Sequence, residues 1–532
     1  MHRSFASSYH TSRLHAHASL LRITVERQYR IPYSSIQNSS RFASSSSGST
    51  SSQEGSASTP VKASSTSSPS TSFSPSSPGP SPSPSQKSSK RPADLPPDWD
   101  DNPDFNVHTF TDLPSSNFGV NQHIIINNEF KEALRQILWQ FRAPIRYAFA
   151  YGSGVFPQTA SMTSNPLALH PNPSKAITTV QKGSGKMIDF IFGVSYTQHW
   201  HSLNLQQHRN HYSAVGSLGS SLVSRIQDRW GAGIYFNPYV TVNGTLIKYG
   251  VVNLDTLCRD LSEWDTLYLA GRLQKPVKIL RDDPRVRLAN QINLISAVRT
   301  ALLLLPPTFT EQDLYKTIAG ISYLGDPRMS LGAENLNKVA NIVNHQLSNF
   351  RRLYAPLIEN LPNVSFQDPC CNDPSWVDDP DTNATLAQDM DPIKRGNMVR
   401  RLPKNFREKL YFQYQSKYQI PQLTFNKMME QSNDEDPTRV KRRQGGPFEQ
   451  RIAGEEQGSL NDEVSTVIAQ IIKWPSYSQT IKSVVTAGVR KSWRYIMEKW
   501  DKNREGKRKD KEMAVEKPDD SLPEQSRQKK SP

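Results

Sequence analysis

A glycine–serine–glycine turn directly follows an apolar stretch of the chain. Residues 145–151 are apolar and aromatic apart from one arginine, a composition that predicts a mostly buried strand. Gly152, Ser153 and Gly154 come next, and glycines let a backbone approach a ligand closely. Backbone N–H groups and the Ser153 hydroxyl of such a turn can point at phosphate oxygens, and a helix beginning near Val155 would add its positive end. The alternative is a tight turn that binds nothing.

The carboxylate of Asp189 is the second candidate. It stands inside a largely apolar strand predicted over 186–194. A buried acid is costly unless it is paired or binds a metal, so we expect Asp189 to be catalytic and to hold Mg²⁺. A structural aspartate hydrogen-bonded in the core is the alternative. A glycine–serine turn followed by a strand with a central aspartate resembles the layout of the polymerase-β type nucleotidyltransferases, in which the turn holds a triphosphate and the acid holds the metal.

Basic side chains follow in two further segments. Residues 230–252 predict a β-hairpin around Asn243 and Gly244, with Lys248 on its second strand. Lys248 is within reach of a phosphate if that strand lies beside the strand of Asp189. The segment 267–280 predicts a semi-buried strand and turn, where basic side chains usually have an anionic partner; a solvated basic face is the alternative. The basic residues of this segment are Arg272, Lys275 and Lys278.

Four histidines lie after the Asp189 strand, at 199, 201, 208 and 211. A His-x-His pair on a strand places both imidazoles on one face, where they can bind zinc. No third or fourth ligand is obvious, so hydrogen-bonding roles are favoured over a metal site.

Several motifs together resemble one family. They are Tyr151–Phe156, Ile188–Val194, His199–Asn204, His211–Ser213, Gly231–Pro238, Lys248–Val252 and Leu267–Leu280. In these motifs the chain is similar to the mitochondrial phosphatidate cytidylyltransferases, also called translocator assembly and maintenance proteins. The likeness covers 106–354 and 479–499. It implies synthesis of CDP-diacylglycerol and pyrophosphate from CTP and phosphatidic acid, with Mg²⁺, by a peripheral protein on the matrix side of the mitochondrial inner membrane, upstream of cardiolipin.

The resemblance also implies roles for particular residues. The turn at 152–154 would hold the triphosphate, with Ser153 and Asp189 as catalytic residues. A small winged-helix-like domain would face the nucleotide site and contribute polar residues. Those residues would be Asp326, Arg328, Glu334, Asn335 and Lys338.

One position departs from the common nucleotidyltransferase pattern. A second carboxylate usually stands two residues after the first, and here that position is Ile191. A two-metal site needs more than one acid. Another carboxylate must therefore come from elsewhere, with Asp255, Asp326 and Glu334 as candidates, or the CTP phosphates must supply the remaining ligands.

The composition of the chain indicates which kinds of molecule it could bind. The chain has 532 residues and a formal net charge of +15, which indicates a polyanionic partner such as nucleic acid, a nucleotide or an acidic lipid. Its three cysteines form no Cys-x-x-Cys pattern and indicate neither a disulfide framework nor a zinc site. No apolar run approaches the ~18 residues of a membrane-spanning helix.

The predicted fold class is α+β with long disordered segments. Residues 1–43 are rich in arginine and serine and nearly free of acids, which predicts a mitochondrial transit peptide; a disordered basic tail is the alternative. The segment 44–98 is a Ser/Pro-rich disordered linker. The remaining predicted parts are a polymerase-β-like nucleotidyltransferase domain (99–282), a winged-helix-like domain (283–359), a largely disordered insertion (360–450), C-terminal helices (451–501) and a disordered charged tail (502–532).

The C-terminal helices include a basic amphipathic stretch over 478–500, suited to an anionic membrane surface. A helix docked on the protein's own core is the alternative. The residues expected to contact the membrane are Lys482, Val485, Arg490, Trp493 and Trp500.

Two other functions fit the same composition. One is a nucleotidyltransferase acting on RNA, which the positive charge permits, although no nucleic acid partner is expected. The other is a non-catalytic assembly factor for the import machinery, against which the intact turn and Asp189 argue.

Overall fold

The computed structural model describes residues 99–100, 106–158, 170–326, 337–432, 444–488 and Met497. The predicted transit peptide, Ser/Pro linker and charged tail lie outside these residues. So do Arg328, Glu334 and Asn335, and three of the expected membrane contacts, Arg490, Trp493 and Trp500.

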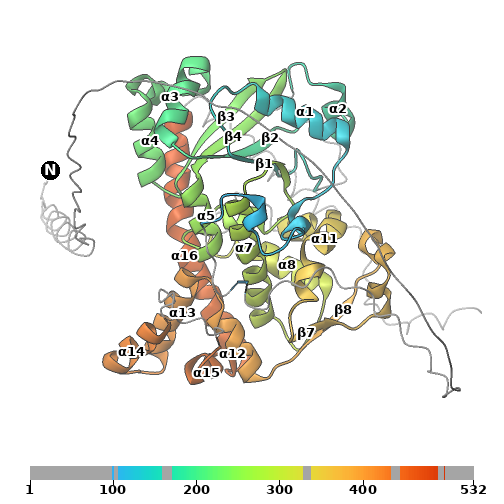
Figure 1. Ribbon diagram of the computed structural model, residues 1–532, viewed down its shortest axis with the longest axis vertical. Helices are drawn as coiled ribbons and strands as arrows, with labels where there is room; N and C mark the ends of the chain where they lie inside the picture. The colour runs from blue at the N-terminus through green and yellow to red at the C-terminus, as the bar shows by residue number, and fades with distance from the viewer. Residues whose placement is uncertain are drawn as a thin grey trace, which may run out of the picture. The chain divides into compact units, whose positions relative to one another are not determined.

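A five-stranded mixed sheet carries the candidate site (Figure 1). Its strand order is β3-β4-β2-β1-β5, with β2 and β4 parallel and the other neighbours antiparallel. The strands are β1 (Tyr147–Tyr151), β2 (Ile188–Val194), β3 (Ile234–Val242), β4 (Thr245–Asn253) and β5 (Lys278–Arg281). The turn between β3 and β4 holds Asn243 and Gly244 at φ 51° and 70°, which confirms the predicted hairpin.

The two faces of the sheet bury two different cores, because successive side chains of a strand point to opposite faces. Phe149 and Ile191 belong to a large core shared with α5 (Leu254–Glu263) and α7 (Pro284–Leu304). Ala150 and Phe190 belong to a second core under α1 (Asn128–Trp139). α1 confirms the helix predicted over 127–141, and the side chain of Asn127 caps its N-terminus.

Helices and short turns complete this part of the chain. The helices are α2 (Lys175–Val180), α3 (Thr197–Gln207), α4 (Ser220–Arg229) and α6 (Ala270–Leu273). Short 3-10 turns lie at Phe110–Asp112, Val120–Gln122, Arg209–His211 and Ala214–Leu218.

A second group of elements begins with α7 and contains a small antiparallel sheet of order β6-β8-β7. Its elements are β6 (Thr308–Thr310), α8 (Glu311–Ile321), α10 (Lys338–His345), α11 (Leu347–Ile358), β7 (Val364–Phe366) and β8 (Thr385–Gln388). A fully buried ion pair, Arg351 to Glu311 at 2.6 Å, joins α11 to α8. The winged-helix-like domain was predicted to end at residue 359. Because β7 and β8 come after that residue and belong to the same sheet as β6, the predicted end falls inside this group.

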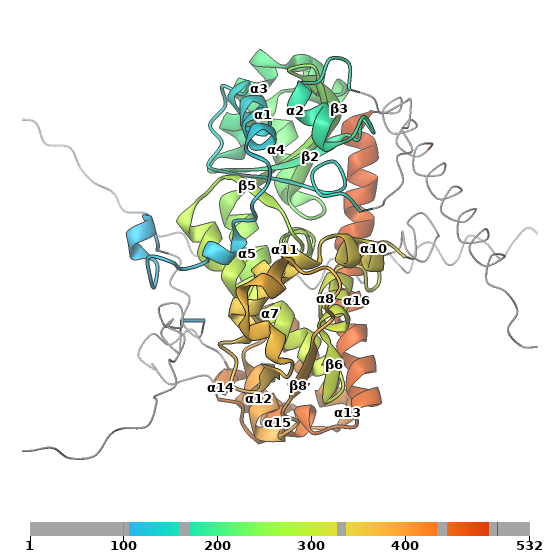
Figure 2. The same ribbon diagram turned by 90° about the vertical axis from the view of Figure 1, so that its right-hand side faces the viewer.

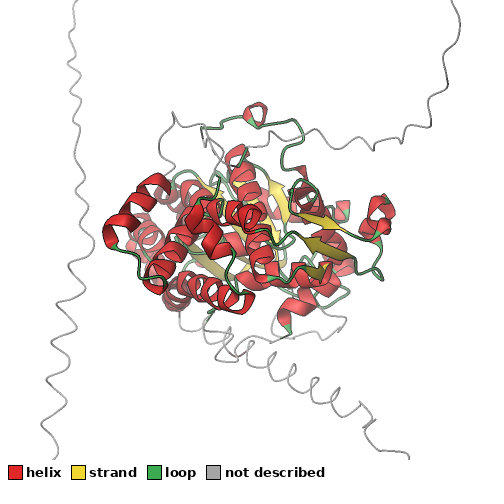
Figure 3. Ribbon diagram, turned by 90° about the horizontal axis from the view of Figure 1, so that it is seen from below, coloured by secondary structure: helices red, strands yellow, loops and turns green. Residues whose placement is uncertain are grey.

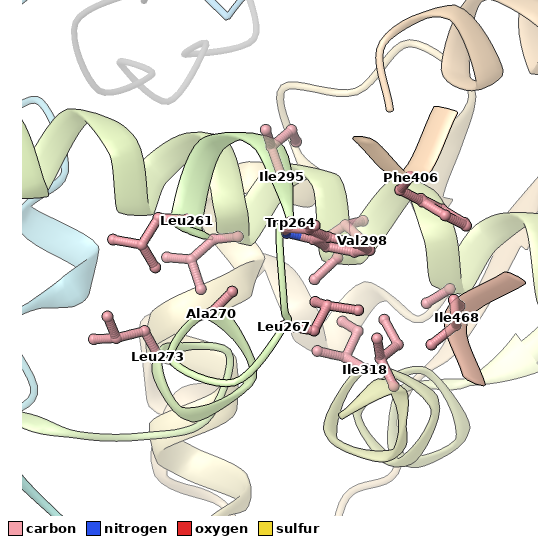
Figure 4. Packing of buried hydrophobic residues seen from close by; sticks show 14 of the residues in the cluster. Leu261, Trp264, Leu267, Ala270, Leu273, Ile295, Val298, Ile318, Phe406 and Ile468 are labelled. Carbon is pink, nitrogen blue, oxygen red and sulfur yellow. The ribbon is translucent and has the colours of Figure 1, made fainter. Parts of the chain in front are cut away.

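The prediction of a largely disordered insertion over 360–450 is wrong for its described residues. They form β7, β8, two 3-10 turns and four helices. These are Pro369–Asn372, Pro374–Asp378, α12 (Pro392–Arg400), α13 (Lys404–Lys417), α14 (Gln422–Ser432) and α15 (Pro447–Ala453). Phe406 of α13 stacks on Trp264 at 5.5 Å inside the large core (Figure 4). In this segment apolar residues at helical spacing alternate with many charged residues. The high content of charged residues led to the prediction of disorder.

Most of the region predicted as C-terminal helices (451–501) is a single helix as far as the structure describes it. This helix, α16 (Gln457–Ala487), continues through Pro475 and includes the first part of the amphipathic stretch predicted over 478–500. It runs beside α13 and α7 and reaches β3 of the main sheet (Figure 2). Its first half buries Leu460, Val464 and Ile468 in the large core. Seen from below, helices lie around the strands of both sheets (Figure 3). Among the described residues, no helix combines the length and apolar character that a membrane crossing requires.

Candidate functional site

The glycine–serine turn lies against the carboxylate of Asp189. Tyr151, the last residue of β1, pairs with Asp189 near the start of β2, so the turn leaves the sheet beside that side chain. Gly152 has φ +80°, and a Cβ there would lie 3.2 Å from Asp189 Oδ2. A Cβ on Gly154 would lie 2.5 Å from the carbonyl oxygen of Met187. Gly152 therefore has a backbone conformation that favours glycine, and Gly154 has no room for a side chain. Close approach of this turn to a phosphate stays a prediction.

No helix begins at Val155 in the described part of this loop, which ends at residue 158. The amides of Val155 and Phe156 both donate to the carbonyl oxygen of Gly152, at 3.0 and 2.9 Å, and close a single turn. The predicted helix N-terminus is thus wrong, and backbone amides and the Ser153 hydroxyl are what this turn offers a phosphate.

Lys248 reaches the same carboxylate from the neighbouring strand. Asp189 and Lys248 are paired positions of the parallel strands β2 and β4. The Lys248 ammonium lies 3.6 Å from Asp189 Oδ1 and 4.6 Å from the ring centre of Phe236. The side chain of Asp189 is 25% exposed and that of Lys248 is 18% exposed, so Asp189 is a paired and accessible acid. The strand of Lys248 lies beside the strand of Asp189, as expected.

Arg272 adjoins the turn from α6. Its guanidinium lies 4.0 Å from the ring centre of Tyr268, and its Nε donates to the Tyr151 hydroxyl at 3.3 Å. Tyr151 in turn precedes the glycine–serine turn. Arg272 is therefore fixed by two tyrosines at one side of the turn.

Lys275 connects α6 to the second group of elements. Its Nζ donates to Ser322 Oγ at 2.8 Å and to the carbonyl oxygen of Gly271, and it lies 5.1 Å from the ring centre of Tyr323. Burial lowers the pKa of Lys275 to about 7, and the positive charges of Arg272 and Lys338 lower it further. The Lys338 ammonium lies 5.6 Å from the same Tyr323 ring.

These contacts gather a carboxylate, a glycine turn and several cations from both halves of the chain. Residues 134–502 match the family model described as "Phosphatidate cytidylyltransferase, mitochondrial". The chain belongs to this family. Relatives of that name include proteins of Schizosaccharomyces pombe (46% identical over 247 residues), Saccharomyces cerevisiae (42% over 259) and Xenopus laevis (36% over 371).

The alignments differ in reach. They cover 46%, 48% and 69% of this chain, respectively. The chain spans 58% and 62% of the length of the first two relatives and 92% of the Xenopus protein.

Asp326 lies five residues after the end of α8. It is buried, and its amide donates to the carbonyl oxygen of Tyr323 at 3.2 Å. This places it in the loop that carries the Tyr323 ring. Of the other residues expected from the second domain, Lys338 joins the cluster, while Arg328, Glu334 and Asn335 lie outside the described residues.

Lys278 is not part of the cluster, and the prediction that it binds phosphate in this cleft is wrong. It pairs with Ala150 across β1 and β5, so it points to the face opposite Tyr151 and Asp189. There it is buried and donates to the carbonyl oxygen of Ile124 at 2.6 Å.

Asp255 is also remote from Asp189. It follows the C-terminal end of β4, whereas Lys248, the partner of Asp189, stands near the start of that strand. Asp255 pairs with Arg285 at 3.1 Å. The described residues hold no group of three or more His, Cys, Asp or Glu side chains arranged to bind a metal.

The histidines serve the scaffold. Residues 199 and 201 lie on α3, a helix, so the predicted strand is wrong there. Both ring nitrogens of His201 are engaged, with the Tyr212 hydroxyl at 2.8 Å and Gln227 Oε1 at 2.7 Å, and burial lowers its pKa to about 4. His211 contacts the Tyr249 hydroxyl at 2.9 Å. These contacts hold α3 and α4 against β4 and leave His201 no nitrogen for zinc.

Lys482 is not a surface residue, and its predicted membrane contact is wrong. It is fully buried, and its ammonium donates to the carbonyl oxygens of Gln227, at 3.2 Å, and Trp230, at the end of α4. Gln479, one turn earlier, bonds the amide of Ala232 and the carbonyl of Ile234 at 3.2 Å each. The polar face of α16 thus docks on the protein, while Val485 is 44% exposed.

Sequence reasoning missed the aromatic rings and the hydroxyl that hold the cations. Tyr151, Tyr268 and Tyr323 each lie beneath a basic group, and Ser322 accepts from Lys275. Tyr151 directly precedes Gly152, and Tyr268 lies four residues before Arg272, so both stand in the motifs that indicated the family. Ser322 has no such signal, because its role depends on how α8 meets α6.

Proposed function

We propose that this chain is a phosphatidate cytidylyltransferase that makes CDP-diacylglycerol and pyrophosphate from CTP and phosphatidic acid. The observation that carries the proposal is the meeting of Asp189, Lys248 and the 152–154 turn at one end of the sheet. Family membership supports it. We further propose that it is a mitochondrial protein, as the names of the relatives say of those proteins. From the family resemblance we also propose that it is peripheral on the matrix side of the inner membrane, acts upstream of cardiolipin and carries a transit peptide at 1–43.

We propose the polymerase-β-like fold for the sheet domain and a winged-helix-like fold for the second group. In support, the glycine turn follows β1 and the aspartate lies on the paired strand β2. The described elements of the second group follow in the order α7, β6, the helices α8, α10 and α11, and then β7 and β8. In its sheet, β8 lies between β6 and β7.

In the proposed reaction, a phosphate oxygen of phosphatidic acid attacks the α-phosphorus of CTP. The bond from that phosphorus to the bridging oxygen breaks, and pyrophosphate leaves. A phosphate monoester is largely dianionic at neutral pH because its second pKa is about 6, so no strong general base is needed. Catalysis then consists of positioning and charge neutralisation. The turn at 152–154 holds the triphosphate, and Lys248, Arg272 and Lys275 neutralise it.

The residues present fit one Mg²⁺ ion bound together with the nucleotide. Mg²⁺ is commonly held by one or two carboxylates plus substrate phosphates and water, and Asp189 is an accessible carboxylate beside the phosphate turn. When bound, the ion would withdraw charge from the phosphate oxygens. Asp189 would hold it, and Lys248, now released from its pair with Asp189, would turn to a phosphate oxygen.

We propose that α16 brings the protein to the anionic membrane that contains phosphatidic acid. Its outer face carries an exposed apolar stripe, which we call the α16 stripe. The stripe consists of Trp474, Tyr477, Ile481, Val484 and Val485. Such a face on a surface helix suits a lipid interface, and the expected contacts Arg490, Trp493 and Trp500 would extend it.

The deciding experiment is an assay of the purified full chain with each nucleoside triphosphate, Mg²⁺ and liposomes that contain phosphatidic acid. Of the nucleoside triphosphates, we expect only CTP to give CDP-diacylglycerol and pyrophosphate, and we expect turnover by an Asp189→Asn variant to be strongly reduced. Turnover that requires RNA instead of phosphatidic acid would overturn the proposal, as would the absence of turnover with every nucleotide in a folded protein that binds the liposomes.

A further inference from the structure

A concave basic surface lies between the end of α1 and the start of β1. The pocket has a volume of about 440 Å³ and is lined by Arg135, Trp139, Arg142, Ile145, Leu280 and Arg281, among others. We call it the arginine pocket. Its walls come from the last turns of α1, the loop before β1 and the end of the edge strand β5.

The arginine pocket is separate from the candidate active site. Asp189 is paired with Tyr151 at the end of β1, whereas the pocket precedes Tyr147 at its start. The strand alone separates them by about 13 Å. They also lie on opposite faces, because Ile145 and Leu280 pack with the core under α1 and Tyr151 packs with the other core.

The charge of the pocket is largely unbalanced. Arg135 has one acidic neighbour, Glu132, at 3.9 Å. Arg142 and Arg281 are exposed and make no ion pair with any residue that the structure describes. Three guanidinium groups around one depression favour a phosphate, which arginine binds with paired N–H donors.

A lipid is favoured over a soluble phosphate by the apolar rim. Trp139 is 65% exposed beside the pocket, with the Arg135 guanidinium 5.9 Å from its ring centre. Leu138 is partly exposed next to it. An exposed tryptophan among arginines is the combination that membrane interfaces accept, since the ring enters the headgroup layer and the cations meet its phosphates.

We propose that the arginine pocket binds the phosphate group of an anionic phospholipid, as a membrane contact distinct from both the catalytic cleft and the α16 stripe. The proposal does not rest on the reaction proposed above, because it concerns binding to a surface that contains no cleft residue. It gives the sheet domain its own attachment point, so that α16 is not the sole contact with the bilayer.

The test is flotation of the full chain with vesicles of phosphatidylcholine alone or mixed with phosphatidic acid. The test variant is Arg142→Ala with Arg281→Ala. Its matched control is Lys409→Ala with Lys427→Ala, which removes the same charge from exposed positions of α13 and α14. Each basic residue at an anionic surface changes partitioning about fivefold, so we expect roughly a 25-fold loss for the test variant and little change for the control. Trp139→Ala should weaken binding to the same vesicles.

Equal partitioning of the test variant and the control would overturn the proposal, as would equal binding of the natural chain to both kinds of vesicle. Calorimetry with inorganic phosphate separates the two sources of the ligand. Arginine-dependent binding of free phosphate without arginine-dependent flotation would overturn the lipid assignment. If the alanine variant loses its thermal transition, Arg142→Gln with Arg281→Gln replaces it, and the same outcomes decide.

Discussion

The ammonium of Lys248 lies 3.6 Å from the Asp189 carboxylate, at paired positions of two parallel strands. The pair stands at the end of the sheet from which the 152–154 turn emerges. The Asp189 side chain is 25% exposed and lies beside Gly152 of that turn. Asp189 therefore has an electrostatic partner in the structure. Under the proposed function, Lys248 would bind a phosphate oxygen once Asp189 holds a metal ion.

The first prediction concerns this acid. Asp189→Asn keeps the shape of the side chain and removes its charge, so it should lower turnover about 100-fold or more, the scale of losing one electrostatic group at a reacting phosphate. The measurement is CDP-diacylglycerol formation, with circular dichroism and a melting curve to confirm the fold. Asp255→Asn, the same substitution at the far end of β4, should leave turnover nearly unchanged. Near-normal turnover in a folded Asp189→Asn protein would rule out its metal role.

The second prediction concerns the turn. Gly154→Ala puts a Cβ 2.5 Å from the Met187 carbonyl oxygen, a backbone atom of the neighbouring strand that cannot rotate away. We expect a loss of about 1–3 kcal/mol in the free energy of unfolding, as for overpacked sites, and weaker CTP binding because the turn shifts. Gly458→Ala meets no atom within 4 Å and serves as the control in urea unfolding. A Gly154→Ala protein as stable as the natural one would contradict the observed close approach.

The third prediction is a pH dependence that Lys275 confers. Burial, Arg272 and Lys338 lower its pKa to about 7, so the charge that would neutralise the triphosphate is present below pH 7 and is lost as the pH rises through 7. CTP affinity, measured by calorimetry, should therefore fall between pH 6 and 8. Lys275→Arg stays charged across this range and should bind more tightly than the natural chain at pH 8.

Lys275→Ala provides the comparison for that titration. It should bind CTP weakly and with a smaller pH dependence, which then reflects the titration of the nucleotide itself. If the natural chain and Lys275→Ala show the same slope of affinity against pH, the slope does not come from Lys275.

Local chemistry made much of the site predictable from the sequence. The apolar run before Gly152 and the Asn243–Gly244 pair specify their strand and hairpin through short-range rules, and the cost of burying Asp189 alone indicated a charged partner. The face on which Lys278 would lie was not predictable in the same way. It depends on the register of β5 on β1, which is set by contacts distant in sequence.

The C-terminal helix shows a second limit. Periodicity predicted a helix with an apolar side and a basic side. A helix that packs on its own protein usually buries its apolar side, but the second half of α16 packs through polar side chains and leaves apolar ones exposed. The polar residues Gln479 and Lys482 satisfy backbone groups of the Gln227–Ile234 segment, and this outweighs burial of the apolar side. No local pattern announces those partners, because they lie roughly 250 residues away in the chain.

The fourth prediction tests that docking. Lys482→Ala leaves the carbonyl oxygens of Gln227 and Trp230 without their buried donor, which should lower the free energy of unfolding by about 1–3 kcal/mol. Lys473→Ala removes an exposed lysine from the same helix and should have little effect in the same urea titration. Liposome binding of the Lys482→Ala protein should persist while it is folded. A selective loss of liposome binding with unchanged stability would restore the membrane role that was first expected for Lys482.

The last prediction concerns the α16 stripe. Its five apolar side chains are between 41% and 71% exposed, although burying them elsewhere on the protein would be favourable. Trp474→Ser with Ile481→Ser removes the tryptophan and a central aliphatic residue without touching the docked face of the helix. We expect this variant to keep its melting temperature and its CTP affinity and to lose most of its flotation with phosphatidic acid vesicles. Phe412→Ser with Leu423→Ser removes two other exposed apolar side chains, from α13 and α14, and should float like the natural chain. Reduced stability without reduced flotation would instead assign the stripe to contacts within the protein. Equal loss of flotation in both double variants would show that the vesicles respond to exposed apolar surface in general and not to α16.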